Sequence, residues 1–169
     1  MKQLVRGIDA LVAGIGRAAS LLNILLIILV VVDVLLRWFF SLTAAWVIEL
    51  EWHLFSLIFL LGIPYALQQD RHVRVDLFYE KFSPADKRLV NLVGGLIFLL
   101  PWAVVLLYFS TQYAYESWLS AEGSPNPNGI PRYFPIKAVV PFSAALLILQ
   151  GLAECYRAAT DTTPQPEES

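Results

Sequence analysis

The chain has 169 residues and a formal net charge of -2 at pH 7, and 57% of its residues are hydrophobic whereas only 15% are charged. Soluble domains carry about 25% charged residues, so this composition indicates a single integral membrane domain. The acidic balance argues against a nucleic-acid binder, and one cysteine with two histidines is too few for an internal disulfide or a structural zinc site.

Residues 1–17 are predicted to form an amphipathic helix on the cytoplasmic surface of the membrane. Apolar residues recur there at helical spacing while charged residues take other positions, so one face of the helix is apolar. The apolar set consists of Leu4, Ile8, Leu11, Val12 and Ile15. A helix of this kind lies in the membrane interface rather than across the bilayer. A disordered N-terminal tail is the alternative interpretation.

Residues 18–40 form the first predicted transmembrane helix. At 1.5 Å per residue the stretch is about 34 Å long, which is enough to cross a hydrocarbon core of about 30 Å. It is too long for the apolar core of a cleavable signal peptide, and such a core would not contain Asp33 and Arg37.

The second predicted span, residues 46–67, carries polar residues near one end. Its uncharged part, residues 54–67, is short for a transmembrane helix. The stretch therefore crosses the membrane only if Glu49, Glu51 and His53 are tolerated near its outer end.

Two further spans are predicted at residues 89–109 and 138–153. The third span is uncharged throughout, and Pro101 is expected to kink it. The fourth span is marginal in length and is bounded by Lys137 and Glu154, whose charged groups can snorkel toward water. Residues 18–156 are therefore predicted to form one four-helix transmembrane domain, in an all-α fold.

The segments after the third and fourth spans are predicted to be non-helical. Residues 120–135 contain four prolines and two glycines, which preclude a helix and indicate an ordered outer loop. Residues 157–169 are predicted to be a disordered cytoplasmic tail, because the segment has almost no apolar side chains to bury.

The basic residues are distributed unevenly among the connections. Nine of the twelve Lys and Arg residues precede the first span, separate the second from the third, or follow the fourth. These nine are Lys2, Arg6, Arg17, Arg71, Arg74, Lys81, Lys87, Arg88 and Arg157. Because cytoplasmic loops carry the excess of Lys and Arg, both termini are predicted to lie in the cytoplasm.

Four polar residues are predicted to form a ladder between the first two spans. Only residues 41–45 separate these spans, so the two helices should be antiparallel neighbours. Counted from that turn, Arg37 and Glu49 lie at one level, and Asp33 and His53 lie one turn deeper. Mutual pairing would offset the cost of charges inside a membrane. A proton or cation relay, or a clamp for a substrate carboxylate around Arg37, is the alternative.

Glu51 is predicted to face a different neighbour. It lies about 200° around the helix from Glu49, at about 100° per residue. We therefore expect Glu51, together with the adjacent Trp52, to contact another subunit. The chain has no phosphate-binding glycine loop and no Ser/His/Asp order that maps onto a catalytic fold, so we expect neither an enzyme nor a cofactor.

Two segments of the chain resemble a known family. The first contains Trp46, Glu49, Leu50 and Gly62, followed by His72, Val73, Arg74, Val75 and Asp76. This string resembles the small membrane subunit of tripartite ATP-independent periplasmic (TRAP) transporters, the DctQ-type proteins. The second, similar to one branch of that family, contains Glu122, Gly123, Ser124, Pro125, Gly129, Ile130, Pro131, Ile136, Lys137, Ala138 and Pro141. The likeness covers residues 18–154, and Pro64 departs from the pattern.

The resemblance implies a role in a bacterial inner-membrane transporter. In such a complex a periplasmic binding protein captures an organic acid or similar solute, and a large permease subunit moves it together with sodium ions. The small subunit braces the large one and supports docking of the binding protein, without binding substrate itself. On this view Glu51 and Trp52 contact the large subunit within the membrane lipid.

The resemblance also suggests which residues face the binding protein. The outer loop and its borders combine rigid aromatic side chains with an arginine, a composition that suits protein interfaces. The residues are Trp118, Arg132, Tyr133 and Phe134. A plain surface loop is the alternative interpretation.

Two other classes of protein remain as alternatives. A membrane anchor of a respiratory oxidoreductase could bind haem between its helices, but His53 and His72 lie at opposite ends of the second span and cannot ligate one iron. A small self-sufficient dimeric exporter would need a central unpaired carboxylate, whereas Asp33 is predicted to lie toward the outer side with His53 opposite.

Overall fold

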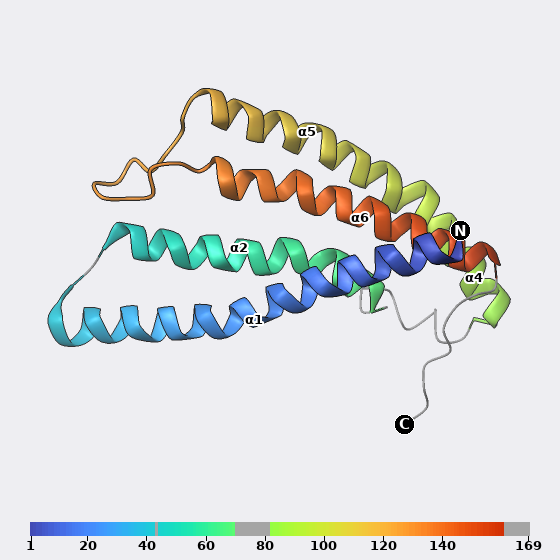
Figure 1. Cartoon of the computed structure of the whole chain (residues 1–169), viewed down its shortest axis with the longest axis horizontal. Helices are drawn as coiled ribbons and strands as arrows, with labels where there is room; N and C mark the ends of the chain where they lie inside the picture. Colours follow the sequence, from blue (N-terminus) through green and yellow to red (C-terminus); the bar gives the residue numbers. More distant parts are fainter. Residues whose placement is uncertain (43, 70–81, 161–169) are drawn as a thin grey trace.

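The computed structural model describes residues 1–42, 44–69 and 82–160, and over these residues it is helical with no strand. Four helical rods follow one another along the chain (Figure 1). They are α1 (Lys2–Phe40), α2 (Ala45–Gln68), a third rod made of α4 (Pro84–Gly94), η1 (Gly95–Leu99) and α5 (Leu100–Leu119), and α6 (Phe134–Thr160). In the described part of the chain these four rods are long and apolar enough to cross a membrane. The predicted all-α fold with four spans is confirmed.

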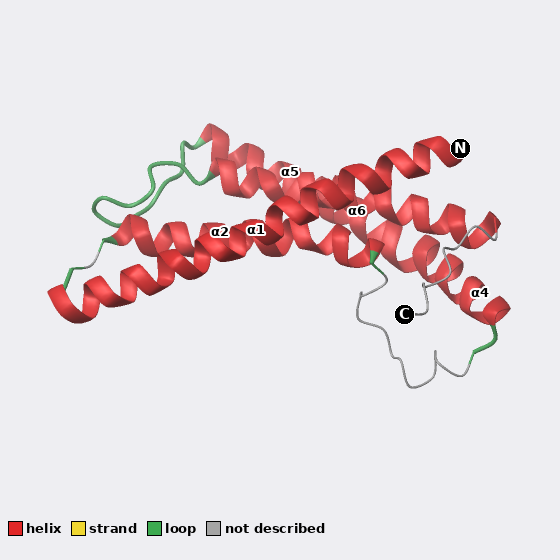
Figure 2. Ribbon diagram, turned by 60° about the horizontal axis from the view of Figure 1, so that its bottom comes forward, coloured by secondary structure: helices red, strands yellow, loops and turns green. Residues whose placement is uncertain are grey.

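The rods lie side by side in an open row rather than in a closed bundle. Figure 1 shows the order α1, α2, α6, α5, and the packing contacts follow it, with α2 on α1, α6 on α2 and α5 on α6. The first half of α1 and the short helix α4 depart from the row, and both contact α6 (Figure 1 and Figure 2). The small core of Leu67, Ala103 and Leu147 lies where α2, α5 and α6 meet.

Helix α1 is continuous over 39 residues, whereas the sequence predicted a separate element over residues 1–17. No proline interrupts this stretch, so the helix passes through the predicted boundary. At 1.5 Å per residue α1 is about 58 Å long, roughly twice the thickness of a hydrocarbon core. Val12 is buried as part of the apolar face, but Leu4 and Leu11 are exposed. The placement of residues 1–17 on the cytoplasmic interface stays a prediction.

The third rod extends well beyond the predicted span of residues 89–109. Its first helix is capped by Ser83, whose hydroxyl accepts a 3.2 Å hydrogen bond from the backbone N–H of Asp86. The predicted kink takes the form of a π-helical turn, η1, which directly precedes the turn that contains Pro101. Proline lacks an N–H and crowds the preceding turn, and a wider π turn relieves that crowding.

Helix α6 also extends beyond its prediction, from Phe134 to Thr160. Residues 157–160, which the sequence assigned to a disordered tail, are helical, and Arg157 is buried. In this extended part, Arg157 pairs with Glu154 of the same helix. Residues 161–169 of the predicted tail, and the inner connection that contains His72, lie outside the described residues.

Candidate functional site

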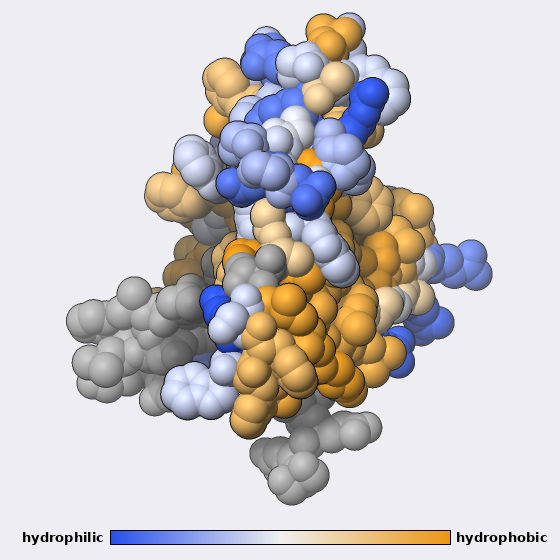
Figure 3. Space-filling model, turned by 90° about the vertical axis from the view of Figure 1, so that its left-hand side faces the viewer, coloured by the Kyte–Doolittle hydropathy of each residue, from blue (hydrophilic) through white to orange (hydrophobic). Residues whose placement is uncertain are grey.

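We call the end of the row that carries residues 120–133 the loop end. The α1–α2 hairpin extends further at this end than α5 and α6 do (Figure 1). The loop extends beyond the ends of α5 and α6 and lies beside the end of α2. The polar residues that the sequence singled out gather here. Figure 3 views this end face-on and shows polar side chains over one half and apolar side chains over the other.

The ion pair on α1 forms within the helix. Arg37 pairs with Asp33, one turn earlier, and Asp33 is only 5% exposed. The predicted ladder instead linked Arg37 to Glu49 across the hairpin. The difference arises because the i,i+4 spacing already places the two side chains of α1 on one face, so Arg37 finds its carboxylate without α2.

Glu49 faces the loop instead of α1. Its carboxylate accepts hydrogen bonds from the Ser124 hydroxyl, the Asn126 amide at 3.1 Å and the Ile130 backbone N–H at 2.6 Å. Glu49 is 3% exposed, so the loop provides nearly all of its surroundings on this side of α2.

His53 packs in an aromatic cluster at the same end. Its Nδ1 donates to the backbone carbonyl of Glu49, and its ring lies 5.0 Å from Trp52 and 5.6 Å from Tyr133. Its Nε2 is buried without a hydrogen-bond partner among the described residues. The predicted contact between His53 and Asp33 is therefore replaced by contacts with α2 and the loop.

Glu51 is the α2 carboxylate that faces α1. It interacts electrostatically with Asp33 and with Arg37, and its Oε1 is buried without a hydrogen-bond partner in the part of the chain that the structure describes. The sequence placed this interaction on Glu49. The adjacent Trp52 is 48% exposed. A contact of Glu51 and Trp52 with another subunit stays a prediction.

Hydrogen bonds within the loop, and an ion pair where it joins the helices, hold its shape. Backbone hydrogen bonds of 2.9 Å join Ser124 to Ile130 and Tyr133 to Glu122. We call the place where the two ends of the loop join α5 and α6 the neck of the loop. There Lys137 pairs with Glu122 and lies 4.0 Å above the ring of Tyr113. The hydrogen bond from Lys137 lowers the pKa of Glu122 below its usual value. These contacts give the predicted non-helical segment a defined shape.

The aromatic and basic residues predicted to meet a partner lie around this loop. Trp118 and Phe134 pack edge-to-face at 4.7 Å across the loop's neck. Trp118 is 53% exposed and Arg132 is exposed, whereas Tyr133 is half-buried against Trp52. The four residues therefore border one region, which combines an exposed cation with aromatic surface.

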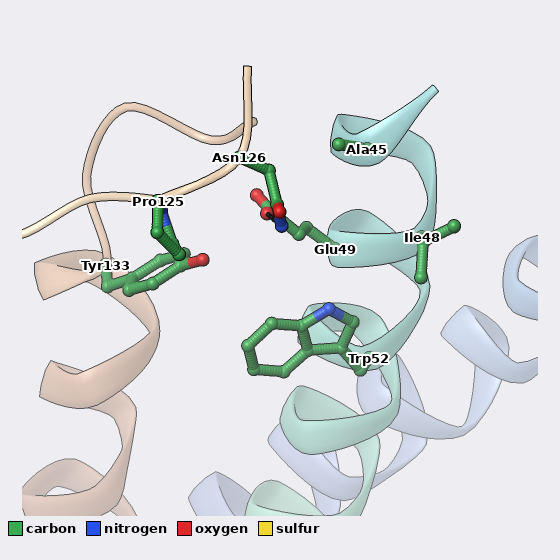
Figure 4. A pocket seen from close by; sticks show the side chains of 7 residues that line it. All are labelled: Ala45, Ile48, Glu49, Trp52, Pro125, Asn126 and Tyr133. Atoms are coloured by element: carbon green, nitrogen blue, oxygen red, sulfur yellow. Dashed lines mark hydrogen bonds between the residues drawn. The ribbon is translucent and has the colours of Figure 1, made fainter. Parts of the chain in front are cut away.

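A hollow of about 470 Å³ opens between the loop and α2. Figure 4 shows its two walls, with Glu49 and Asn126 meeting between them. The lining residues are Ala45, Ile48, Glu49, Trp52, Pro125, Asn126 and Tyr133. Within the described ranges no cluster of three His, Cys, Asp or Glu side chains is placed to hold a metal ion.

A second polar cluster, at the opposite end of the row, was not predicted. Arg157 bonds to Asp9 at 2.7 Å and to Glu154. Gln150, which is fully buried, donates to both carboxylates, and Gln68 donates to the Asp9 backbone carbonyl at 2.8 Å. No local pattern reveals this cluster, because its members come from three helices.

Comparison with known proteins identifies a family for this chain. The family model described as the DctQ component of tripartite ATP-independent periplasmic transporters matches residues 26–161. No curated protein matches the chain. The match includes part or all of each of the four rods, and it confirms the resemblance predicted from the sequence. The chain therefore belongs to the DctQ family and is a small multi-pass membrane subunit of a tripartite ATP-independent periplasmic transporter.

Proposed function

We propose that this subunit braces the large, sodium-coupled permease subunit of its transporter in the bacterial inner membrane. The complex takes up an organic acid or similar solute that a periplasmic binding protein delivers. Both termini lie in the cytoplasm, as the distribution of Lys and Arg indicates, so the loop end faces the periplasm.

The open row of helices is the observation that supports a bracing role. The described helices are arranged in a row rather than around a central channel, and the helices at its two edges carry exposed apolar side chains. Ile24 and Ile27 on α1 are 60% and 62% exposed, and Trp102 and Phe109 on α5 are 67% and 61% exposed. Apolar faces of this extent are covered by lipid or by another membrane subunit.

The charged residues within the first two membrane spans also fit a bracing role. Asp33 is buried and already paired with Arg37, and Glu49 is occupied by the loop. An ion relay would need carboxylates that are free to exchange a cation or proton. Glu51 is partly exposed and Trp52 is half-exposed, so these two residues supply the contact with the large subunit.

The loop end supplies the contact with the binding protein. Arg132 is exposed at the surface that becomes periplasmic in this topology, and Trp118, Tyr133 and Phe134 lie in the same loop or at its borders. Aromatic residues and arginine supply much of the binding energy in protein interfaces.

Uptake by purified components in vesicles tests this function. Vesicles are prepared with the chain alone, with the large subunit alone, or with both, and are supplied with the binding protein and a panel of labelled carboxylic acids under a sodium gradient. We expect uptake only when both membrane subunits are present. Uptake by the chain alone would contradict a bracing role and would favour the exporter interpretation.

A further inference from the structure

The carboxylate of Glu49 is the point on which the periplasmic loop converges. Side-chain donors come from Ser124 and Asn126, and a backbone donor comes from Ile130. Ser124 and Asn126 lie in the outgoing half of the loop and Ile130 lies in the returning half, so a single carboxylate joins the two halves. Charge-assisted hydrogen bonds of this kind are roughly twice as strong as neutral ones.

The backbone of the loop is shaped to admit this carboxylate. A Cβ at Gly129 would lie 2.1 Å from the Ser124 hydroxyl oxygen and 2.8 Å from Oε1 of Glu49. A Cβ at Gly123 would lie 2.3 Å from the carbonyl oxygen of Pro131. Both glycines are therefore required where the two halves of the loop approach each other around Glu49.

Among the described residues, the groups that donate to Glu49 are uncharged. Arg37 is directed to Asp33 on the other side of the hairpin, and Lys137 is directed to Glu122 at the neck of the loop. A carboxylate that is 3% exposed is costly to bury unless its oxygens are hydrogen-bonded, so the folded loop and the buried Glu49 depend on each other.

We propose that Glu49 is the positioning residue of the docking surface. Its carboxylate holds residues 120–133 in the conformation that receives the binding protein, although Glu49 itself touches no partner. Fixing a loop in its bound conformation raises affinity by removing the entropic cost of ordering it. The inference rests on the proposed function, because it assigns the loop to the binding protein.

The test uses the assembled membrane complex in nanodiscs with its binding protein. Glu49→Ala removes the carboxylate, Glu49→Gln keeps the shape but directs an amide donor toward other donors, and Glu116→Ala changes an exposed glutamate near the end of α5 as the matched control. Hydrogen exchange of the loop amides and the Kd of the binding protein are measured for each. We expect both Glu49 variants to exchange faster and to bind about tenfold more weakly, a loss that corresponds to one charge-assisted hydrogen bond, while Glu116→Ala matches the original chain.

Chemical rescue separates positioning from general loss of stability. In Glu49→Ala, added formate can occupy the vacated position and accept the same hydrogen bonds, so it should restore slow exchange and tight docking, whereas chloride at equal ionic strength should not. If Glu49→Ala fails to assemble, the test uses Glu49→Gln alone, with hydrogen exchange of the loop amides and the Kd of the binding protein as the measurements. Unchanged loop exchange or unchanged affinity in Glu49→Gln overturns the inference.

A third variant, Arg132→Glu, distinguishes this inference from the proposed function. Weakened docking in Arg132→Glu with normal docking in Glu49→Gln would overturn only the positioning role. Normal docking in Arg132→Glu would overturn the proposal that the loop meets the binding protein, whatever the behaviour of Glu49.

Discussion

Arg157 of α6 donates a 2.7 Å hydrogen bond to the carboxylate of Asp9 in α1, although the two residues lie 148 positions apart in the sequence. The bond fixes the first turns of α1 against the end of α6. Gln150 and Glu154 extend the same cluster along α6, so the two terminal segments of the described chain form one polar joint.

Breaking this joint should destabilise the subunit. Asp9→Ala leaves Arg157 with only Glu154, and we expect the free energy of unfolding to fall by about 1–3 kcal/mol, the cost of an unsatisfied buried polar group. The measurement is thermal unfolding in detergent, followed by circular dichroism. Arg157→Ala and the double variant complete a mutant cycle, and additive effects in that cycle would show that the two side chains do not interact.

The four spans could be predicted because bilayer insertion depends on local length and composition. The rotation of each helix about its own axis could not be predicted from the sequence. Counting residues from the turn placed Glu49 and Arg37 at one level, yet the structure directs Glu49 to the loop and Glu51 to α1. Which of two carboxylates faces α1 depends on where α6 and the loop pack, and that information lies far along the chain.

The packing of the polar residues near the helix ends could not be predicted for a related reason. Glu154 and Arg157 look like the polar border of a span, and Asp9 looks like part of a polar helix face. Arg157 becomes buried, and Asp9 and Glu154 become partly buried, because three helices bring them together. Apolar periodicity therefore defined the middle of each rod well, whereas partners distant in sequence extended α6 beyond its predicted end.

Gly16 should be intolerant of any side chain. A Cβ there would lie 2.3 Å from Cγ of Tyr65, where α1 crosses α2. We expect Gly16→Ala to lower the free energy of unfolding by about 1–3 kcal/mol through overpacking. Gly14→Ala is the matched control, because no atom lies within 4 Å of its added Cβ, and it should be neutral or stabilising by about 0.5–1 kcal/mol. Equal effects in thermal unfolding would contradict this packing.

Removing one partner of the α1 ion pair should destabilise the fold more than replacing both partners. Arg37→Leu leaves the buried Asp33 without its counter-charge, and we expect a loss of about 1–3 kcal/mol in the free energy of unfolding. Replacing both residues with leucine should recover most of that loss, since apolar pairs often substitute well for buried ion pairs. Chemical unfolding of the single and double variants measures both values. A double variant less stable than Arg37→Leu would indicate that Asp33 has a further partner.

The neck of the loop should weaken in acid. The hydrogen bond from Lys137, together with its positive charge, lowers the pKa of Glu122 from its ordinary value of 4.5. A lowered pKa means that the ionised form stabilises the fold, so the contribution is complete above about pH 4.5 and disappears as the pH falls through the lowered value. We therefore expect Glu122→Gln to have a lower Tm than the original chain near neutral pH.

The difference in Tm between Glu122→Gln and the original chain should shrink as the pH falls below about 4.5, because both then carry a neutral group at this position. Comparing the two proteins at each pH removes the contribution of all other carboxylates. Lys137→Met removes the partner instead and should reduce the same pH-dependent difference. A Tm difference that persists unchanged in acid would mean that Glu122 acts through its shape and packing rather than through its charge.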